Sequence, residues 1–230
     1  MPVKLEVREN PAEACAELLC AAASERGHLV LAGGSTPRAA YEAAAAQDRD
    51  WSGATVWFGD ERCVPPDDDR SNFRMVKESL LDRLQGGPTV HRIEGELGPQ
   101  DAAAAYERAL KDAGPPEFDL VLLGLGPDGH TASLFPRAPT LSARERLVIG
   151  VPEAGLEPFV PRVTMTFPVL GAAKSVVFLV SGDAKAGAVA AAFGPDAKPD
   201  PRVPASMLPP FASDLTVLLD PAAATGVPSP

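Results

Sequence analysis

The stretch LVLLGLGPDGHTASLFP, residues 120–136, decides how this sequence folds. It opens on an apolar run, the centre of the segment 118–126, and passes directly into a loop rich in glycine. A strand that is apolar at every position is buried on both faces, which is typical of a parallel sheet covered by helices. The loop that follows fits the pattern G-x-G-x-x-G, and His130 comes directly after its last glycine. It is therefore either a dinucleotide cradle or a support for a catalytic histidine.

Apolar strands alternate with helical segments along the rest of the chain. Strands are expected at 3–7, 27–34, 54–61, 89–95, 118–126, 146–151, 162–167, 174–182 and 214–220, and helices at 11–26, 35–47, 71–84, 99–114 and 183–193. This alternation predicts an α/β protein: a single three-layer domain, residues 1–230, with a largely parallel, Rossmann-like sheet covered by helices on both faces. Ligands of such sheets bind beyond the carboxyl ends of the strands, so a site is expected in the loops that follow them.

The composition limits the partners and the compartment. A net charge of −10 argues against nucleic acid or an anionic membrane, because both require a basic face. Cys15, Cys20 and Cys63 are odd in number and lack C-x-x-C spacing, so neither a disulfide framework nor a zinc site is predicted. The sequence has no apolar run of transmembrane length and no signal-peptide pattern at residues 1–10. We therefore expect a cytoplasmic protein, and by default a monomer.

The loop LAGGSTP, residues 31–37, is a candidate phosphate site. Glycines allow close backbone approach, and Ser35 and Thr36 are expected to cap the following helix while donating to an anion. Pro37 in the first helical turn uses no N–H that an anion needs. Free N–H groups and the helix dipole favour phosphate at such a position. The loop is not a Walker motif, and an ordinary capped turn remains the alternative.

A second loop, GDERCVPPDDDRSNF, is strongly acidic. Asp60, Glu61 and Arg62 emerge directly from a strand end, so at least one of them is expected to face the site. Arg62 suits a phosphate or carboxylate because its guanidinium donates in a fork. Several carboxylates could also bind calcium or magnesium, but prolines split the cluster and the EF-hand order is absent. The run 67–69 is better explained as a solvated loop.

The glycine pattern of the opening stretch is a poor match to a dinucleotide site. Such a site needs a helix immediately after the glycines, and here Pro127 lies between them and Pro136 follows soon after. A loop that projects His130 into the cleft is the better interpretation, because a neutral imidazole can deprotonate water near neutral pH. His28 and His91 are expected to be structural. Ser133 is not in a G-x-S-x-G elbow, so water is the preferred nucleophile.

Together these loops resemble the 6-phosphogluconolactonase family, part of a wider group that includes glucosamine-6-phosphate deaminases. The matching motifs occur in the family's order: LAGGSTP, WFGDERCVPPDDDRSN, LLGLGPDGHTASLFP, RVTMTF and VSGDAKAGAV. The deaminases typically carry Met-Asp-Glu-Tyr where this chain has GDERCVP, and Ile-Ala-Phe-Asn-Glu after the histidine where it has TASLFP. Both differences favour the lactonase. Arg70 replaces a residue that is often acidic in relatives, so Arg70 is left out of the site.

The resemblance implies hydrolysis of 6-phospho-D-glucono-1,5-lactone to 6-phosphogluconate, a step of the oxidative pentose phosphate pathway, with no metal or organic cofactor. By similarity, His130 is the general base that activates water, and Asp128 and Asp60 shape the catalytic site. The substrate and its phosphate are expected to be bound by Gly33, Gly34, Ser35, Thr36, Arg62, Gly129, Arg162 and Lys185. Two alternatives stay open: an isomerase or deaminase acting on a sugar phosphate with the same scaffold, and a non-catalytic sugar-phosphate-binding protein.

Overall fold

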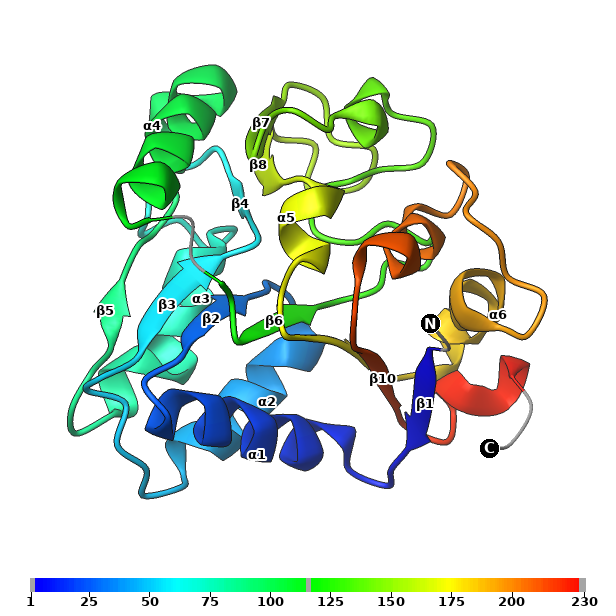
Figure 1. The fold of residues 1–230 in the computed structure, drawn as a ribbon, viewed down its shortest axis with the longest axis horizontal. Helices are drawn as coiled ribbons and strands as arrows, with labels where there is room; N and C mark the ends of the chain where they lie inside the picture. Colours follow the sequence, from blue (N-terminus) through cyan, green and yellow to red (C-terminus); the bar gives the residue numbers. More distant parts are fainter. Residues whose placement is uncertain (1–2, 115–116, 228–230) are drawn as a thin grey trace.

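A seven-stranded sheet forms the centre of the computed structural model, which describes residues 3–114 and 117–227 (Figure 1). The strand order is β1-β10-β9-β6-β2-β3-β5, and every neighbouring pair is parallel. Its strands are β1 (Lys4–Val7), β2 (His28–Leu31), β3 (Thr55–Phe58), β5 (Thr89–Val90), β6 (Leu120–Leu123), β9 (Ser175–Val180) and β10 (Leu215–Leu219). This confirms the predicted α/β class and the parallel character of the main sheet.

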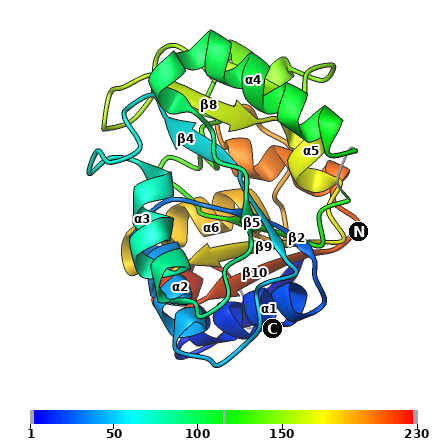
Figure 2. The same cartoon turned by 90° about the vertical axis from the view of Figure 1, so that its left-hand side faces the viewer.

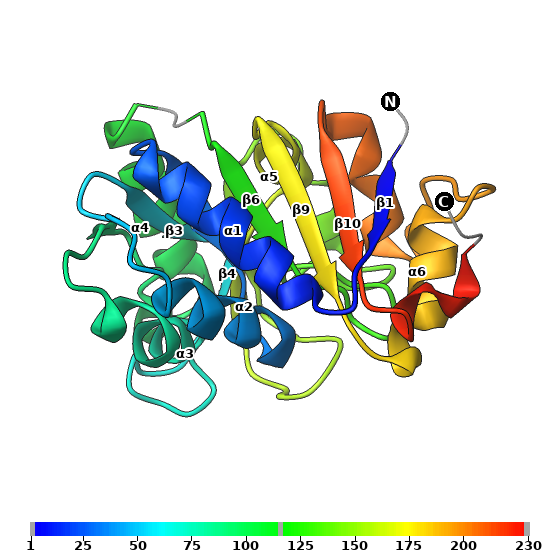
Figure 3. The same cartoon turned by 90° about the horizontal axis from the view of Figure 1, so that it is seen from below.

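Helices cover the sheet on both sides. They are α1 (Pro11–Ser24), α2 (Ser35–Ala45), α3 (Asn72–Ser79), α4 (Pro99–Asp112), α5 (Phe167–Gly171) and α6 (Ala186–Phe193). Seen from below, α1 and α2 run across one face of the strands (Figure 3). The opposite face carries α5 and the small sheet described next, and α4 packs on the outer side of that sheet (Figure 2). Asn10 caps α1 by accepting the Glu13 N–H.

A second sheet of three antiparallel strands was not anticipated. It consists of β4 (Asp60–Arg62), β8 (Arg162–Met165) and β7 (Val148–Val151), in that order. The single strand expected at 54–61 is wrong, because the chain changes sheets at Gly59. The Gly59 N–H donates to Leu31 of β2 at 3.0 Å, while its carbonyl accepts from Met165 of β8 at 2.8 Å. Asp60 and Arg62 are therefore held above the main sheet and not within it.

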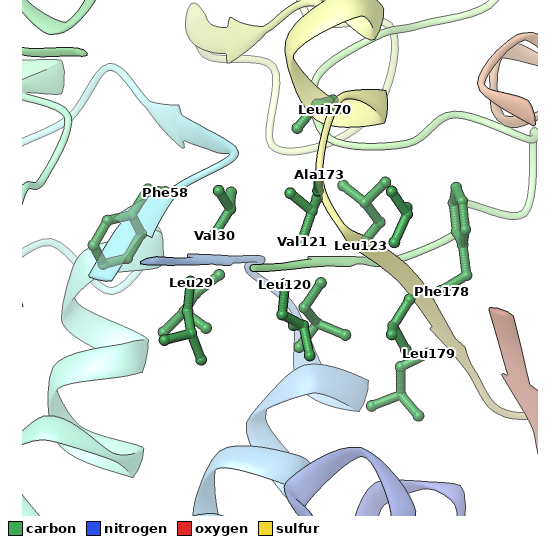
Figure 4. Packing of buried hydrophobic residues seen from close by; sticks show 14 of the residues in the cluster. Leu29, Val30, Phe58, Leu120, Val121, Leu123, Leu170, Ala173, Phe178 and Leu179 are labelled. Atoms are coloured by element: carbon green, nitrogen blue, oxygen red, sulfur yellow. The ribbon is translucent and has the colours of Figure 1, made fainter. Parts of the chain in front are cut away.

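The core lies on both faces of the parallel sheet. Alternate residues of β2 and β6 point to opposite sides, Leu29 and Leu120 to one and Val30 and Val121 to the other (Figure 4). All four are essentially inaccessible to solvent. This two-sided burial explains why the strands are apolar at every position. No helix in the ranges 3–114 and 117–227 is both long and apolar enough to span a membrane.

Candidate active site

A cleft of about 250 Å³ lies beyond the carboxyl ends of the central strands. The loops after β2, β3, β6 and β9 line it, together with the connection between β7 and β8. It brings together most of the predicted site residues: Gly33, Gly34, Ser35, Thr36, Asp60, Arg62, His130, Arg162 and Lys185. These side chains come from segments as far apart as residues 33 and 185. Their convergence at one edge of the sheet is the arrangement that the positions of the loops predicted.

His130 is held by its neighbours in the loop after β6. The Gly126 N–H donates to the His130 carbonyl at 2.8 Å, and Nδ1 of the imidazole lies 2.6 Å from Oδ1 of Asp128. A Cβ on Gly126 would lie 2.0 Å from Nδ1, so only glycine allows this close approach. The ring also packs at 5.1 Å, centroid to centroid, on Phe135. With 20% of its side chain exposed, His130 is fixed but reachable from the cleft.

Asp128 determines which imidazole nitrogen is available. Burial alone would raise the pKa of this carboxyl, but the hydrogen bonds and charge of His130 hold the pKa below its ordinary value. An ionised Asp128 accepts the Nδ1–H, which leaves the lone pair of a neutral imidazole on Nε2. Asp128 itself is not among the residues that line the cleft. Its contact with a residue that lines the cleft is the one with His130.

Gly129, predicted to bind substrate, also lies outside the cleft lining. Its carbonyl accepts the Ala205 N–H at 2.9 Å, and the position of its missing side chain faces Val203. The residue belongs to the turn that supports His130 from behind. No α-helix follows this turn within the described chain before Phe167, and a 3₁₀ turn at Pro139–Ser142 is the next helical element. The loop therefore lacks the helix that a dinucleotide site requires.

The GGST loop, residues 33–36, also lines the cleft. Gly34, with a φ of 107°, caps α2, so the expected side-chain cap from Ser35 or Thr36 is wrong. Ser35 and Thr36 are instead the first residues of the helix, and within the described chain their N–H groups have no hydrogen-bond acceptor. Gly33 has no room for a side chain, because a Cβ there would lie 1.8 Å from Oδ1 of Asn72. Free N–H groups at a helix N-terminus suit an anion.

Three cations surround the space in front of this loop. Arg62 donates from Nη1 to the Arg70 carbonyl at 2.8 Å, and its buried Nε has no partner among the described residues. Lys185 is half-buried, and this burial lowers its pKa although the charge of Asp128 acts in the opposite direction. Neither side chain forms an ion pair within the described part of the chain.

Arg162 is the third cation and is only 4% exposed. It donates to the carbonyls of Pro158 at 2.8 Å and Val160 at 3.2 Å, so it also fixes the connection between β7 and β8. Burial lowers its pKa, the charge of Asp60 raises it and that of Arg62 lowers it. The register of β4 and β8 places Arg62 directly opposite Arg162. Like charges at such a position repel, and an anion between them would relieve that repulsion.

Asp60 is 7% exposed and lines the cleft. Its Oδ2 accepts from the Ser133 hydroxyl at 2.6 Å, and its Oδ1 accepts from Nδ2 of Asn72 at 3.2 Å. Glu61 points away and accepts the N–H groups of Asn72 and Phe73 at the start of α3. Of the segment 60–62, Asp60 and Arg62 therefore line the cleft and Glu61 does not.

Sequence reasoning missed several residues of the site. Asn72 and Glu157 line the cleft, and Ser133 holds Asp60 from behind it. Asn72 lies in the motif DDDRSN and begins a helix, so its position in the matched motif was the one available signal. The acidic run belongs to the surface: Asp68 pairs with Arg70, and Asp69 pairs with Arg74. Among the described residues, no group of three His, Cys, Asp or Glu side chains is placed to hold a metal.

The chain as a whole is similar to known proteins. The sequence profile of the family described as glucosamine-6-phosphate isomerases/6-phosphogluconolactonase matches residues 4–217. The 6-phosphogluconolactonase of Synechocystis sp. is 41% identical over 209 residues, covering 86% of this chain and 85% of the relative. That of Nostoc sp. is 41% identical over 203 residues, covering 85% and 82%. The crystal structure of 6-phosphogluconolactonase from Leishmania guyanensis has a TM-score of 0.85 at 30% identity and covers 100% of both chains. The chain therefore belongs to the 6-phosphogluconolactonase family, within the superfamily of the glucosamine-6-phosphate isomerases.

Proposed function

We propose that this protein hydrolyses 6-phospho-D-glucono-1,5-lactone to 6-phosphogluconate, the lactonase step of the oxidative pentose phosphate pathway. Relatives of about 40% identity over most of the chain carry that name. The observation that supports the proposal most strongly is the pairing of His130 with Asp128 at 2.6 Å, in the same cleft as three cations. The cleft therefore contains both a candidate base and a group of cations. This combination suits a substrate that has a carbonyl at one end and a phosphate at the other.

In this mechanism His130 acts as a general base. Nε2 takes a proton from a water as the water oxygen forms a bond to C1 of the lactone, and the carbonyl oxygen becomes an oxyanion. The bond between C1 and the ring oxygen then breaks, and the imidazolium returns the proton to that leaving oxygen. Asp128 accepts from Nδ1 throughout, so it stabilises the imidazolium that forms in between. The product is an open-chain acid that releases its carboxyl proton to solvent.

Binding of the remote phosphate supplies orientation. Arg62, Arg162 and Lys185, with the N–H groups that begin α2, would bind the phosphate and so place C1 near Nε2. Fixing a reactant in this way lowers the barrier, because the entropy of alignment is lost on binding and not in the transition state. The three cations also explain how a chain of net charge −10 can accept an anionic substrate.

Ser133 is not a suitable nucleophile in place of water. Its side chain is 0% exposed, and its hydroxyl already donates to Asp60.

We also propose that residues 1–230 act as one catalytic domain, as a monomer, in the cytoplasm. Static light scattering on the purified protein measures its molar mass in solution and so tests the proposed monomer.

The test is a coupled assay with freshly generated lactone, with the spontaneous hydrolysis rate subtracted at each pH. We expect native protein to accelerate hydrolysis, and His130→Ala to lower kcat at least about 100-fold with KM little changed. His91→Gln is the matched control and should retain kcat, because His91 does not line the cleft. Normal turnover by the His130 variant would refute the base assignment.

The same preparation separates the alternatives. Release of ammonia from glucosamine 6-phosphate would indicate a deaminase. Binding of substrate without any acceleration would indicate a sugar-phosphate-binding protein. Equal kcat/KM for the phosphorylated and unphosphorylated lactones would contradict the role of the three cations.

A further inference from the structure

Ser133 is a fully buried serine between the His130 loop and the small sheet. Its hydroxyl donates to Oδ2 of Asp60 at 2.6 Å, across 73 positions of sequence. Ser133 is not among the residues that line the cleft, whereas Asp60 is. Any effect of Ser133 on a bound substrate must therefore pass through another residue.

Asp60 is held from two sides. Ser133 donates to one carboxylate oxygen, and Asn72, itself 1% exposed, donates to the other. Each carboxylate oxygen can accept about two hydrogen bonds, so each retains capacity for a donor from the cleft. Two fixed donors leave the carboxylate a single orientation. A carboxylate held in this way can accept hydrogen bonds from the hydroxyl groups of a sugar.

The His130 loop does not depend on this bond for its shape. The Thr131 hydroxyl donates to the Gly124 carbonyl at 3.0 Å, and the Gly126 N–H donates to the His130 carbonyl at 2.8 Å. The Ser133 N–H donates to the Thr164 hydroxyl at 3.3 Å, a contact made by the backbone and not by the serine side chain. Removing the Ser133 hydroxyl leaves all three bonds in place.

We propose that Ser133 is a positioning residue that sets substrate specificity through Asp60. Its hydroxyl, with Asn72, orients the Asp60 carboxylate so that the free sides of both oxygens accept hydroxyl groups of the sugar lactone. This inference rests on the proposed lactonase function and explains how the cleft would recognise the sugar part of the substrate. Because the carboxylate binds hydroxyl groups that do not react, its contribution is the same in the ground state and the transition state. Loss of the contribution therefore raises KM and leaves kcat nearly unchanged.

The test compares Ser133→Ala with Ser79→Ala. Ser79 is also 0% exposed and donates its hydroxyl to the Met75 carbonyl, at the opposite end of α3 from Asn72. We expect Ser133→Ala to raise KM for the phosphorylated lactone about tenfold, as suits loss of a hydrogen bond to a charged group, with kcat within about threefold. Ser79→Ala should change neither constant. Ser133→Cys, which keeps a hydrogen-bearing group at the same position but donates weakly, should give an intermediate KM and serves if the alanine variant does not fold.

A double-mutant cycle tests whether the effect passes through Asp60. In an Asp60→Asn background, Ser133→Ala should change kcat/KM by less than about twofold, because the two residues act as one unit. A full tenfold effect in that background, or unchanged kinetics of folded Ser133→Ala and Ser133→Cys, would overturn the proposal. Absence of lactonase activity in the native protein would instead refute the proposed function.

Discussion

Nδ1 of His130 lies 2.6 Å from Oδ1 of Asp128, so Nε2 is the ring nitrogen that this contact leaves free. The Asp128 carboxylate is ionised well into the acid range, because the hydrogen bonds and charge of His130 outweigh the effect of burial on its pKa. An amide at the same place could accept from Nδ1–H but would not stabilise the imidazolium with a charge. Replacing Asp128 by asparagine therefore removes the negative charge and keeps an acceptor for the His130 Nδ1–H, so the two contributions can be measured separately.

We expect Asp128→Asn to lower kcat about 10- to 100-fold while KM changes little, because the proposed base loses its charged partner whereas Arg62, Arg162 and Lys185 are unchanged. Steady-state kinetics with subtraction of the spontaneous rate measure both constants. Asp112→Asn, an exposed aspartate at the end of α4, is the control. A kcat equal to that of the native protein would show that Asp128 does not assist His130.

Residues that line the cleft from the loops after strands were easier to predict than residues that orient another side chain by a hydrogen bond. His130, Arg62 and the GGST loop each follow a strand end, so their position along the chain already places them at one edge of the sheet. Ser133 and Asn72 have no such signal. Their roles depend on a contact with Asp60 that forms only when two sheets come together.

At the scale of elements, the edge of the main sheet carries a stack of two rings with a third ring bonded at its rim. Trp57 of β3 packs against His91, which follows β5, with centroids 4.0 Å apart and planes 9° from parallel. At the rim of the indole, the Trp57 Nε1–H donates to Nδ1 of His28 at 3.2 Å. Burial lowers the pKa of His91, and the charge of His28 lowers it further. The interpretation of these two histidines as structural agrees with this packing.

This stack predicts a stability that depends on pH. An unfolded histidine titrates near pH 6.5, and the folded His91 only below that value. As pH falls below about 6.5, the unfolded state binds the proton before the folded state does. The free energy of unfolding therefore decreases with falling pH until the pH reaches the pKa of the folded His91. His91→Gln lacks the titrating group, so only the native protein loses this stability. The difference in free energy of unfolding between the native protein and His91→Gln should therefore be smaller at pH 5.0 than at pH 7.5. Urea titrations at both pH values measure the gap, and a constant gap would contradict the assignment.

Most elements, but not their sheet membership, could be predicted from the sequence. The run 54–61 is apolar up to Phe58 and strand-like beyond it, and nothing local shows that Gly59 transfers the chain to another sheet. The helix expected at 71–84 ends at Ser79, and a short 3₁₀ turn at Leu81–Arg83 follows. Both differences come from tertiary contacts, which hydrophobic periodicity does not encode.

For the whole molecule, the distribution of charge matters more than its sum. The chain is acidic overall, yet Arg62 and Arg162 face each other across β4 and β8 and Lys185 lies in the same cleft. Without an anion these cations repel one another. An anion in the cleft should therefore stabilise the entire fold.

We expect inorganic phosphate at ten times its Kd to raise the melting temperature by about 3–6 °C, which corresponds to ~1.4 kcal/mol for a chain of this size. Arg62→Ala should lose most of this shift. Arg70→Ala should keep it, because the Arg70 side chain is paired with Asp68 and only its backbone carbonyl contacts Arg62. Differential scanning calorimetry over a phosphate series measures the effect, and equal shifts in the two variants would argue against Arg62 as a phosphate ligand.

The pairing of β1 with β10 has a consequence for synthesis of the protein. Lys4 to Val7 lie beside Thr216 to Leu219, so the first strand finds its neighbour only when the last strand has been translated. At ribosomal rates of about 5–20 residues per second, this wait is on the order of 10–40 s. A strand left unpaired for that time can add to the sheets of other nascent chains. Its length of four residues, with Lys4 and Glu6 among them, makes it a poor template for such pairing.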